Sequence, residues 1–202
     1  MTSIAPSLRE LFVQFRSECE WIQRCYNTYR DLWEAGDCRL DLMRVAAPGF
    51  FNDVNRLLIE QLYLRVCMIT DPATSRVAGM ARANLTCHFL NGELTKAGKI
   101  TGEIEALSLD LIRLRDFVLP ARNRLLAHLD VEQVLSGQDD LGAHPEQEAG
   151  LFFSAMQDYC DAVGWAVDEG PLDFSGIGRG PGDVVDLLRL VELGLKAKGA
   201  QA

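Results

Sequence analysis

A long apolar stripe near the start of the chain constrains its fold most. Apolar side chains recur there at alternating steps of four and three residues, at Leu8, Phe12, Phe15, Cys19, Ile22, Tyr26, Tyr29 and Trp33. This spacing keeps them on one face of an α-helix. Ser7 and Glu10 fit a capping box before the stripe, and Gly36 fits a stop after it. The sequence therefore predicts a long helix whose apolar face packs in a core or against a second copy.

The same periodicity recurs along the rest of the chain and predicts further helices. They are expected over about 48–69, 84–94 and 101–118, then through Phe152 to Val167, and last through Leu187 to Leu195 with Asp183 as its cap. Asp71-Pro72 ends the first of these, because a residue before proline is pushed out of the helical region. Pro120 fits either the first turn of a new helix or a kink in a continuing one.

No segment alternates convincingly between apolar and polar residues, and no internal repeat is visible, so the chain is expected to be an all-α bundle. Its 202 residues, 48% of them hydrophobic, suit one domain with a real core. We expect a single helical domain over 1–202, in which 1–46 form the long helix and a connector.

Charge and cysteine usage narrow the classes of function. A net charge of −9 argues against broad binding to duplex DNA or anionic membranes, which needs a basic face. We see no secretory signal and no apolar run near the roughly 18 residues of a membrane span, so a cytoplasmic protein without membrane association is expected. The six cysteines form no Cys-x-x-Cys pair, and His-Glu-x-x-His is absent. We therefore expect reduced thiols and neither a metal nor another cofactor.

The densest chemistry lies in the segment Arg122-Asn-Arg-Leu-Leu-Ala-His-Leu-Asp130. It brings a basic cluster, an amide and one of only three histidines within about two helical turns. An imidazole can take a proton from the 2′-hydroxyl of RNA, and a guanidinium can hold the phosphate. We assign His128 as acid/base, Arg122 as phosphate ligand and Asn123 as orienting group.

Two neighbours of these residues are weaker candidates for binding, Arg124 and Asp130. In an α-helix Arg124 and His128 share a face at i and i+4, whereas Arg122 lies about 120° from His128. One helix does not gather all the groups, and a second protomer could complete the site. A structural role stays open, in which His128 is hydrogen-bonded in a helix interface and the arginines form salt bridges.

The motif resembles the signature of the HEPN superfamily, an arginine followed by four to six residues and a histidine. Arg122 and His128 are separated by five residues, with the polar Asn123 in second place. The resemblance to the abortive-infection-related HEPN family extends to Ile69-Thr-Asp-Pro72, to Asn84-Leu-Thr86 and to the closing Gly182–Leu188 segment. These landmarks span roughly residues 55–195.

The resemblance implies a helical bundle that forms a homodimer with its two motifs facing each other across a cleft. Many HEPN proteins are metal-independent ribonucleases that act as toxins or in phage defence, some of them with a protein antitoxin, and others are inactive binding modules. We therefore expect a metal-independent endoribonuclease acting on RNA. The alternatives are an inactive HEPN binding module and a structural helical interaction protein.

One position departs from the pattern of some HEPN toxins. They carry a tyrosine two residues after the histidine, which a partner nucleotidyltransferase modifies, and this chain has Asp130 there. That antitoxin mechanism therefore does not carry over directly. Asp130 could instead orient His128 or accept a hydrogen bond from an arginine.

Overall fold

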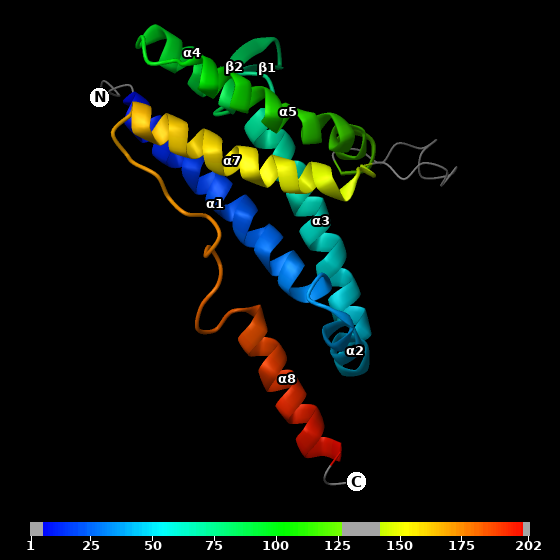
Figure 1. Ribbon diagram of the computed structural model, residues 1–202. Helices are drawn as coiled ribbons and strands as arrows, with labels where there is room; N and C mark the ends of the chain where they lie inside the picture. The colour runs from blue at the N-terminus through cyan, green and yellow to red at the C-terminus, as the bar shows by residue number, and fades with distance from the viewer. Residues whose placement is uncertain (1–5, 127–141, 200–202) are drawn as a thin grey trace, which may run out of the picture. The chain divides into compact units, whose positions relative to one another are not determined.

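The structure, a computed structural model, describes residues 6–126 and 142–199 and is mostly helical (Figure 1). Its elements in order are α1 (Leu8–Trp33), α2 (Asp37–Ala46), α3 (Pro48–Thr70), β1 (Thr74–Val77), β2 (Met80–Ala83), α4 (Cys87–Lys96), α5 (Gly102–Ala121), the π-helical turn η1 (Arg122–Leu126), α7 (Glu146–Ala166) and α8 (Val184–Gly199). The helical character expected from the periodicity is confirmed.

The first helix begins and ends where the sequence indicates. The Ser7 hydroxyl accepts from the Glu10 backbone N–H at 3.2 Å, and the Glu10 carboxylate accepts from the Ser7 N–H at 2.7 Å, so the capping box is formed. The helix stops at Trp33, and Gly36 follows with a φ of 101°, which favours glycine. The connector expected up to residue 46 is itself helical, because α2 occupies most of it.

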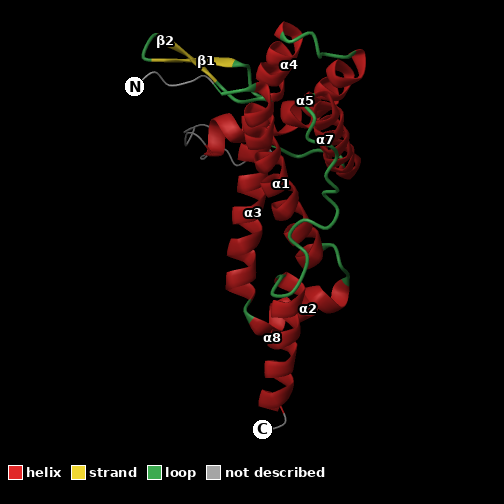
Figure 2. Cartoon of the chain, turned by 90° about the vertical axis from the view of Figure 1, so that its left-hand side faces the viewer, coloured by secondary structure: helices red, strands yellow, loops and turns green. Residues whose placement is uncertain are grey.

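A β-hairpin corrects the expectation of a chain without strands. β1 and β2 pair antiparallel with Val77 opposite Met80, and Ala78 and Gly79 form the turn with φ values of 50° and 80° (Figure 2). Positive φ at both turn residues is the geometry of a type I′ hairpin. The hairpin could not be predicted from the sequence, because both strands have only four residues and β2 is exposed throughout. A strand without a buried face does not need apolar residues at every second position.

The chain divides into two compact units, and each is described by itself. The first comprises residues 1–20 and 63–173, and the second comprises 21–62 and 174–202. α1 and α3 each contribute to both units. The single domain expected from the sequence stays a prediction.

In the first unit, α5 and α7 lie side by side and supply most of the core (Figure 1). Leu111 and Val118 of α5 and Met156 of α7 are fully buried, as are Phe12 and Phe15 of α1. The Tyr159 ring meets Phe15 edge-on at 5.8 Å, and its hydroxyl donates to Asn91 Oδ1 at 2.9 Å. This bond satisfies the one polar atom that the buried ring carries inward.

In the second unit, a smaller apolar core joins the end of α1 to three other helices. Leu32, Met43, Phe51 and Leu188 are buried together, from α1, α2, α3 and α8 respectively. The loop before α8 is fixed to α1 by Asn27, whose Nδ2 donates to the Ile177 carbonyl at 2.9 Å.

None of the helices that the structure describes is long and apolar enough to cross a bilayer.

Candidate functional site

The candidate site begins where α5 changes its helical geometry. The sequence left open whether Pro120 begins a new helix or lies in a continuing one, and it lies inside α5. The Arg122 N–H still bonds to the carbonyls of Val118 and Leu119. From Arg122 to Leu126 the chain then forms a π turn, in which hydrogen bonds span five residues instead of four. Such turns occur frequently at functional sites.

This turn changes one argument made from the sequence. The placement of Arg124 on the face of His128 assumed about 100° per residue, which is the α-helical value and does not hold in a π turn. Arg124 is exposed. His128 and Asp130 lie outside the residues that the structure describes, so their roles stay predictions.

The Arg122 side chain is held by the carboxylate of Asp71, the residue that follows α3. Its Nη2 donates to Asp71 Oδ2 at 3.2 Å, and its Nη1 donates to Asn123 Oδ1 at 2.8 Å. Asp71 follows the last residue of α3, and its N–H bonds to the Cys67 carbonyl at 2.7 Å. The end of α3 thus orients the first residue of the motif, and Asn123 lies against the same guanidinium.

A second arginine shares that carboxylate. Arg115 Nη2 and Nε donate to Asp71 Oδ1 at 3.3 and 3.4 Å, and Arg115 also contacts the exposed Asp116 at 3.4 Å. Asp71 and Arg115 are mostly buried, with 20% and 18% of their side chains exposed, whereas Arg122 is 33% exposed. Asp71 is therefore a single acid between two guanidinium groups. Of the two arginines, Arg122 is the more exposed to solvent. An anion such as a phosphate diester could bind there.

A buried thiol lies behind this cluster and is not reactive. Burial raises the pKa of the Cys67 thiol to about 11, and the Asp71 carboxylate also raises it, whereas Arg122 and Arg115 lower it. Since the thiolate is the nucleophilic form, Cys67 stays protonated near neutral pH. All six cysteines have free thiols, five of them buried, with Cys38 exposed.

Gly142 lies beside the last residue of α5, Ala121. The Tyr63 hydroxyl donates to the Gly142 carbonyl at 3.0 Å, and a Cβ on Gly142 would lie 2.5 Å from the Tyr63 ring and 3.2 Å from Ala121 Cβ. Its φ of 88° also lies in the region that favours glycine, so both the close contact with Tyr63 and the backbone conformation require a glycine at this position. His144 follows, with Nδ1 at 2.8 Å from the Gly142 carbonyl and its ring edge-on to Tyr63 at 6.1 Å. The His144 imidazole therefore lies beside Tyr63 and Gly142.

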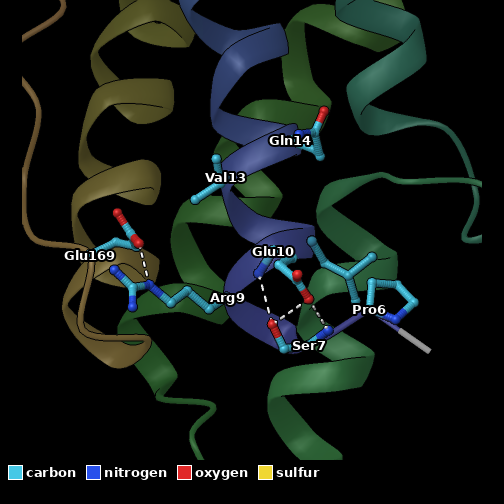
Figure 3. A pocket seen from close by; sticks show the side chains of 8 residues that line it. Pro6, Ser7, Arg9, Glu10, Val13, Gln14 and Glu169 are labelled. Carbon is cyan, nitrogen blue, oxygen red and sulfur yellow. Dashed lines mark hydrogen bonds and ion pairs between the residues drawn. The ribbon is translucent and has the colours of Figure 1, made fainter. Parts of the chain in front are cut away.

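A separate hollow of about 730 Å³ lies at the start of α1, lined by residues from Pro6 to Gln14 and by Glu169 (Figure 3). Its charges are already paired. Arg9 Nε donates to Glu169 Oε1, and Arg16 Nη2 donates to Glu169 Oε2 at 3.3 Å. Hydrogen bonding from Arg9 lowers the pKa of the Glu169 carboxyl. These contacts tie α1 to the loop after α7, so we interpret the hollow as structural.

Over residues 6–126 and 142–199, no group of three histidine, cysteine, aspartate or glutamate side chains is arranged to hold a metal ion.

Comparison with protein families identifies the chain. The HEPN family model described as AbiU2 matches residues 5–179. The chain belongs to the HEPN AbiU2 family. The match includes α1, which lay outside the landmarks read from the sequence, and ends before the Gly182–Leu188 segment that was one of them. Comparisons with curated proteins and with solved structures found no match.

Two residues of this AbiU2-family protein were missing from the sequence-based assignment, Asp71 and Arg115. Asp71 stood in a family landmark as the residue before Pro72, which was interpreted only as a helix end. Asp71 lies 51 residues before Arg122, so nothing in the sequence pairs its carboxylate with the motif. Arg115 had no distinguishing feature, because an arginine in an amphipathic helix usually faces solvent.

Proposed function

We propose that this AbiU2-family protein is a metal-independent endoribonuclease whose site is built on Arg122, Asn123 and His128. The observation that carries the proposal is the Arg122 guanidinium. It stands at the first residue of the family motif, is positioned by Asp71 and Asn123, and remains one-third exposed. A guanidinium that is fixed in direction and open to solvent suits a phosphate ligand.

The reaction uses the substrate's own hydroxyl as nucleophile. His128 removes the 2′-hydroxyl proton, the 2′-oxygen attacks phosphorus, and the bond to the 5′-oxygen breaks, leaving a 2′,3′-cyclic phosphate. The 5′-oxygen receives a proton from an imidazolium or from water. Arg122 stabilises the charge that develops on the phosphate oxygens. Asn123 orients the Arg122 guanidinium, and Arg124 contributes a further phosphate contact.

Family membership supports a dimer in which two motifs face one cleft, with the second protomer completing the site. It also supports a role as a toxin or as a component of phage defence, restrained by a protein antitoxin. The acidic chain, with a net charge of −9, needs its basic cluster concentrated at such a site if RNA is to bind.

RNA cleavage by purified protein in the presence of chelator tests the proposal. Wild type should cleave single-stranded RNA and leave cyclic phosphate ends. His128→Ala should lower the rate by roughly a hundredfold or more through loss of the proton-transfer group. Arg122→Ala should lower it by a similar factor through loss of phosphate stabilisation. End-group analysis of the products checks the mechanism.

Arg113→Ala is the matched control. Arg113 lies on the same helix, α5, but is 56% exposed and pairs with Glu148 at 2.9 Å, away from the motif. It should keep wild-type activity. Cleavage that survives His128→Ala unchanged removes that residue from the mechanism. A wild type that binds RNA without cleaving it would be the inactive HEPN binding module, and loss of folding in both variants would indicate a structural motif.

A further inference from the structure

Two stretches of this acidic chain contain no acidic residue, and one of them lies outside the Arg122 motif. The chain has 29 aspartates and glutamates among 202 residues, yet none occurs from 72 to 92 or from 117 to 129. These are the two longest stretches of this kind in the sequence. The second contains the start of the motif, and the first contains the hairpin of β1 and β2. In both, basic side chains meet no acid that is close in sequence.

The hairpin carries two arginines whose charges are not neutralised. Arg76 of β1 and Arg82 of β2 are exposed. Neither guanidinium forms an ion pair or a hydrogen bond with another residue that the structure describes. Most arginines of the described helices do pair with an acid, as Arg30 does with Glu34 at 3.0 Å. Figure 2 shows the hairpin projecting from the helices, so both guanidinium groups are open to a polyanion.

The base of the hairpin is fixed beside the residue that holds the motif arginine. Asn84 Nδ2 donates to the Pro72 carbonyl at 3.0 Å, and the Asn84 N–H donates to the Ala73 carbonyl at 2.9 Å. Pro72 directly follows Asp71, whose carboxylate accepts from Arg122. The hairpin therefore starts at a defined point next to the candidate site.

The backbone limits how far the hairpin arginines lie from that site. Ser75 is four residues after Asp71, so their Cα atoms are at most about 14 Å apart. Arg82 stands opposite Ser75 in the ladder, about 5 Å further. Stacked nucleotides rise about 3.4 Å each, so about six nucleotides cover this distance. We propose that the hairpin holds the backbone of the RNA strand whose reacting phosphate lies at Arg122.

This inference rests on the proposed function, since it assigns the hairpin to the substrate of that site. RNA fits better than an acidic protein, because one continuous chain of phosphates can contact the motif and the hairpin together. Arginines on an exposed strand also keep its edge from pairing with another chain, but that role does not change RNA affinity. The salt dependence of RNA binding therefore separates the two roles.

Salt-dependent binding tests the hairpin without cleavage. The reference is the full chain with His128→Ala, and the probe is a fluorescein-labelled oligouridine of about 20 nucleotides, followed by fluorescence anisotropy in chelator at several KCl concentrations. Adding Arg76→Gln and Arg82→Gln should weaken binding about fivefold or more at low salt, because contacts to phosphates are lost. The slope of log affinity against log salt should fall by about 0.7 for each arginine that contacts a phosphate.

Single variants and a charge control complete the binding experiment. The register places Arg76 and Arg82 on opposite faces of the hairpin, because opposed residues share a face and successive residues alternate. The single variants therefore show which face the RNA follows. The control is Arg44→Gln with Arg56→Gln, the same change in net charge at arginines of the second unit that are 72% and 81% exposed. It should keep the affinity and the slope of the reference.

Cleavage of short and long RNA separates this inference from the proposed function. With His128 intact, the Arg76→Gln/Arg82→Gln protein should lose about fivefold in kcat/KM on the long oligouridine. The dinucleotide UpU is too short to reach the hairpin and reports the motif alone. A wild type that cleaves neither substrate refutes the ribonuclease, and the salt slope then still decides on the hairpin. An unchanged slope, an equal loss in the control, or a reference protein that binds no RNA overturns the hairpin contact.

Discussion

At the scale of single residues, Asp71 determines how the motif arginine is presented. It is one carboxylate between two guanidinium groups, and both it and Arg115 are about four-fifths buried. Removing a charged partner from such a cluster costs more than removing a surface ion pair, because the groups left behind are already partly desolvated. Asp71 should therefore contribute to stability and to the direction of Arg122 at once.

Asp71→Asn should lower the free energy of unfolding by about 1–2 kcal/mol, since the amide keeps the shape but loses the charge that both arginines need. The matched control is Asp116→Asn, which removes an acid that also contacts Arg115 but is 69% exposed, and it should change stability by less than about 0.5 kcal/mol. Urea unfolding of both variants measures the difference. Equal effects would show that Asp71 is an ordinary surface partner.

At the scale of elements, the sequence predicted the helices whose apolar residues recur with helical spacing. The apolar stripe from Leu8 to Trp33 indicated α1, and the capping box indicated its start, because both depend on local spacing. The hairpin around Ala78 was missed because an exposed four-residue strand has no apolar face to reveal. The π turn after Pro120 was missed because α-helical spacing was the only geometry considered.

The link between α1 and the end of α7 should respond to pH through Glu169. Hydrogen bonding from Arg9 lowers the pKa of this carboxyl in the native state. Its stabilising contribution is therefore fully present above the ordinary glutamate pKa and is lost as the pH falls through the lowered native value. Glu169→Gln should melt at a lower temperature than wild type at neutral pH, and the difference should shrink in acid.

The control for this pH dependence is Asp168→Asn. Asp168 is adjacent but 91% exposed, and its φ of 62° is one that asparagine tolerates. Its melting temperature should stay close to that of wild type at both pH values. A Glu169→Gln difference that persists unchanged below the ordinary glutamate pKa would show that charge is not what joins the two segments.

At the scale of the whole molecule, the family and its helical character were predictable from the sequence, and the partners of the motif were not. Arg122 and His128 are near in sequence, so their spacing alone suggested a signature. Asp71 lies 51 residues before Arg122, and its contact depends on where the residue that follows α3 meets the end of α5. Contacts of that range arise from tertiary packing, which a single sequence does not display.

Folding should depend on neither metal nor disulfides. The core is built from packed helices, and the six thiols are free in the structure. Thermal melts with chelator and with reductant should therefore match the untreated melt. A fall of more than about 10 °C in either would contradict this, since losing a structural metal or disulfide costs several kcal/mol.

The boundary of the family match has a consequence for how related sequences can diverge. The match ends at residue 179, yet Leu188 beyond it completes the core around Leu32, Met43 and Phe51. Those three residues thus depend on a helix that lies outside the matched residues. A relative that lost this helix would expose them to water, so loss of the helix and replacement of these residues by polar ones should be inherited together.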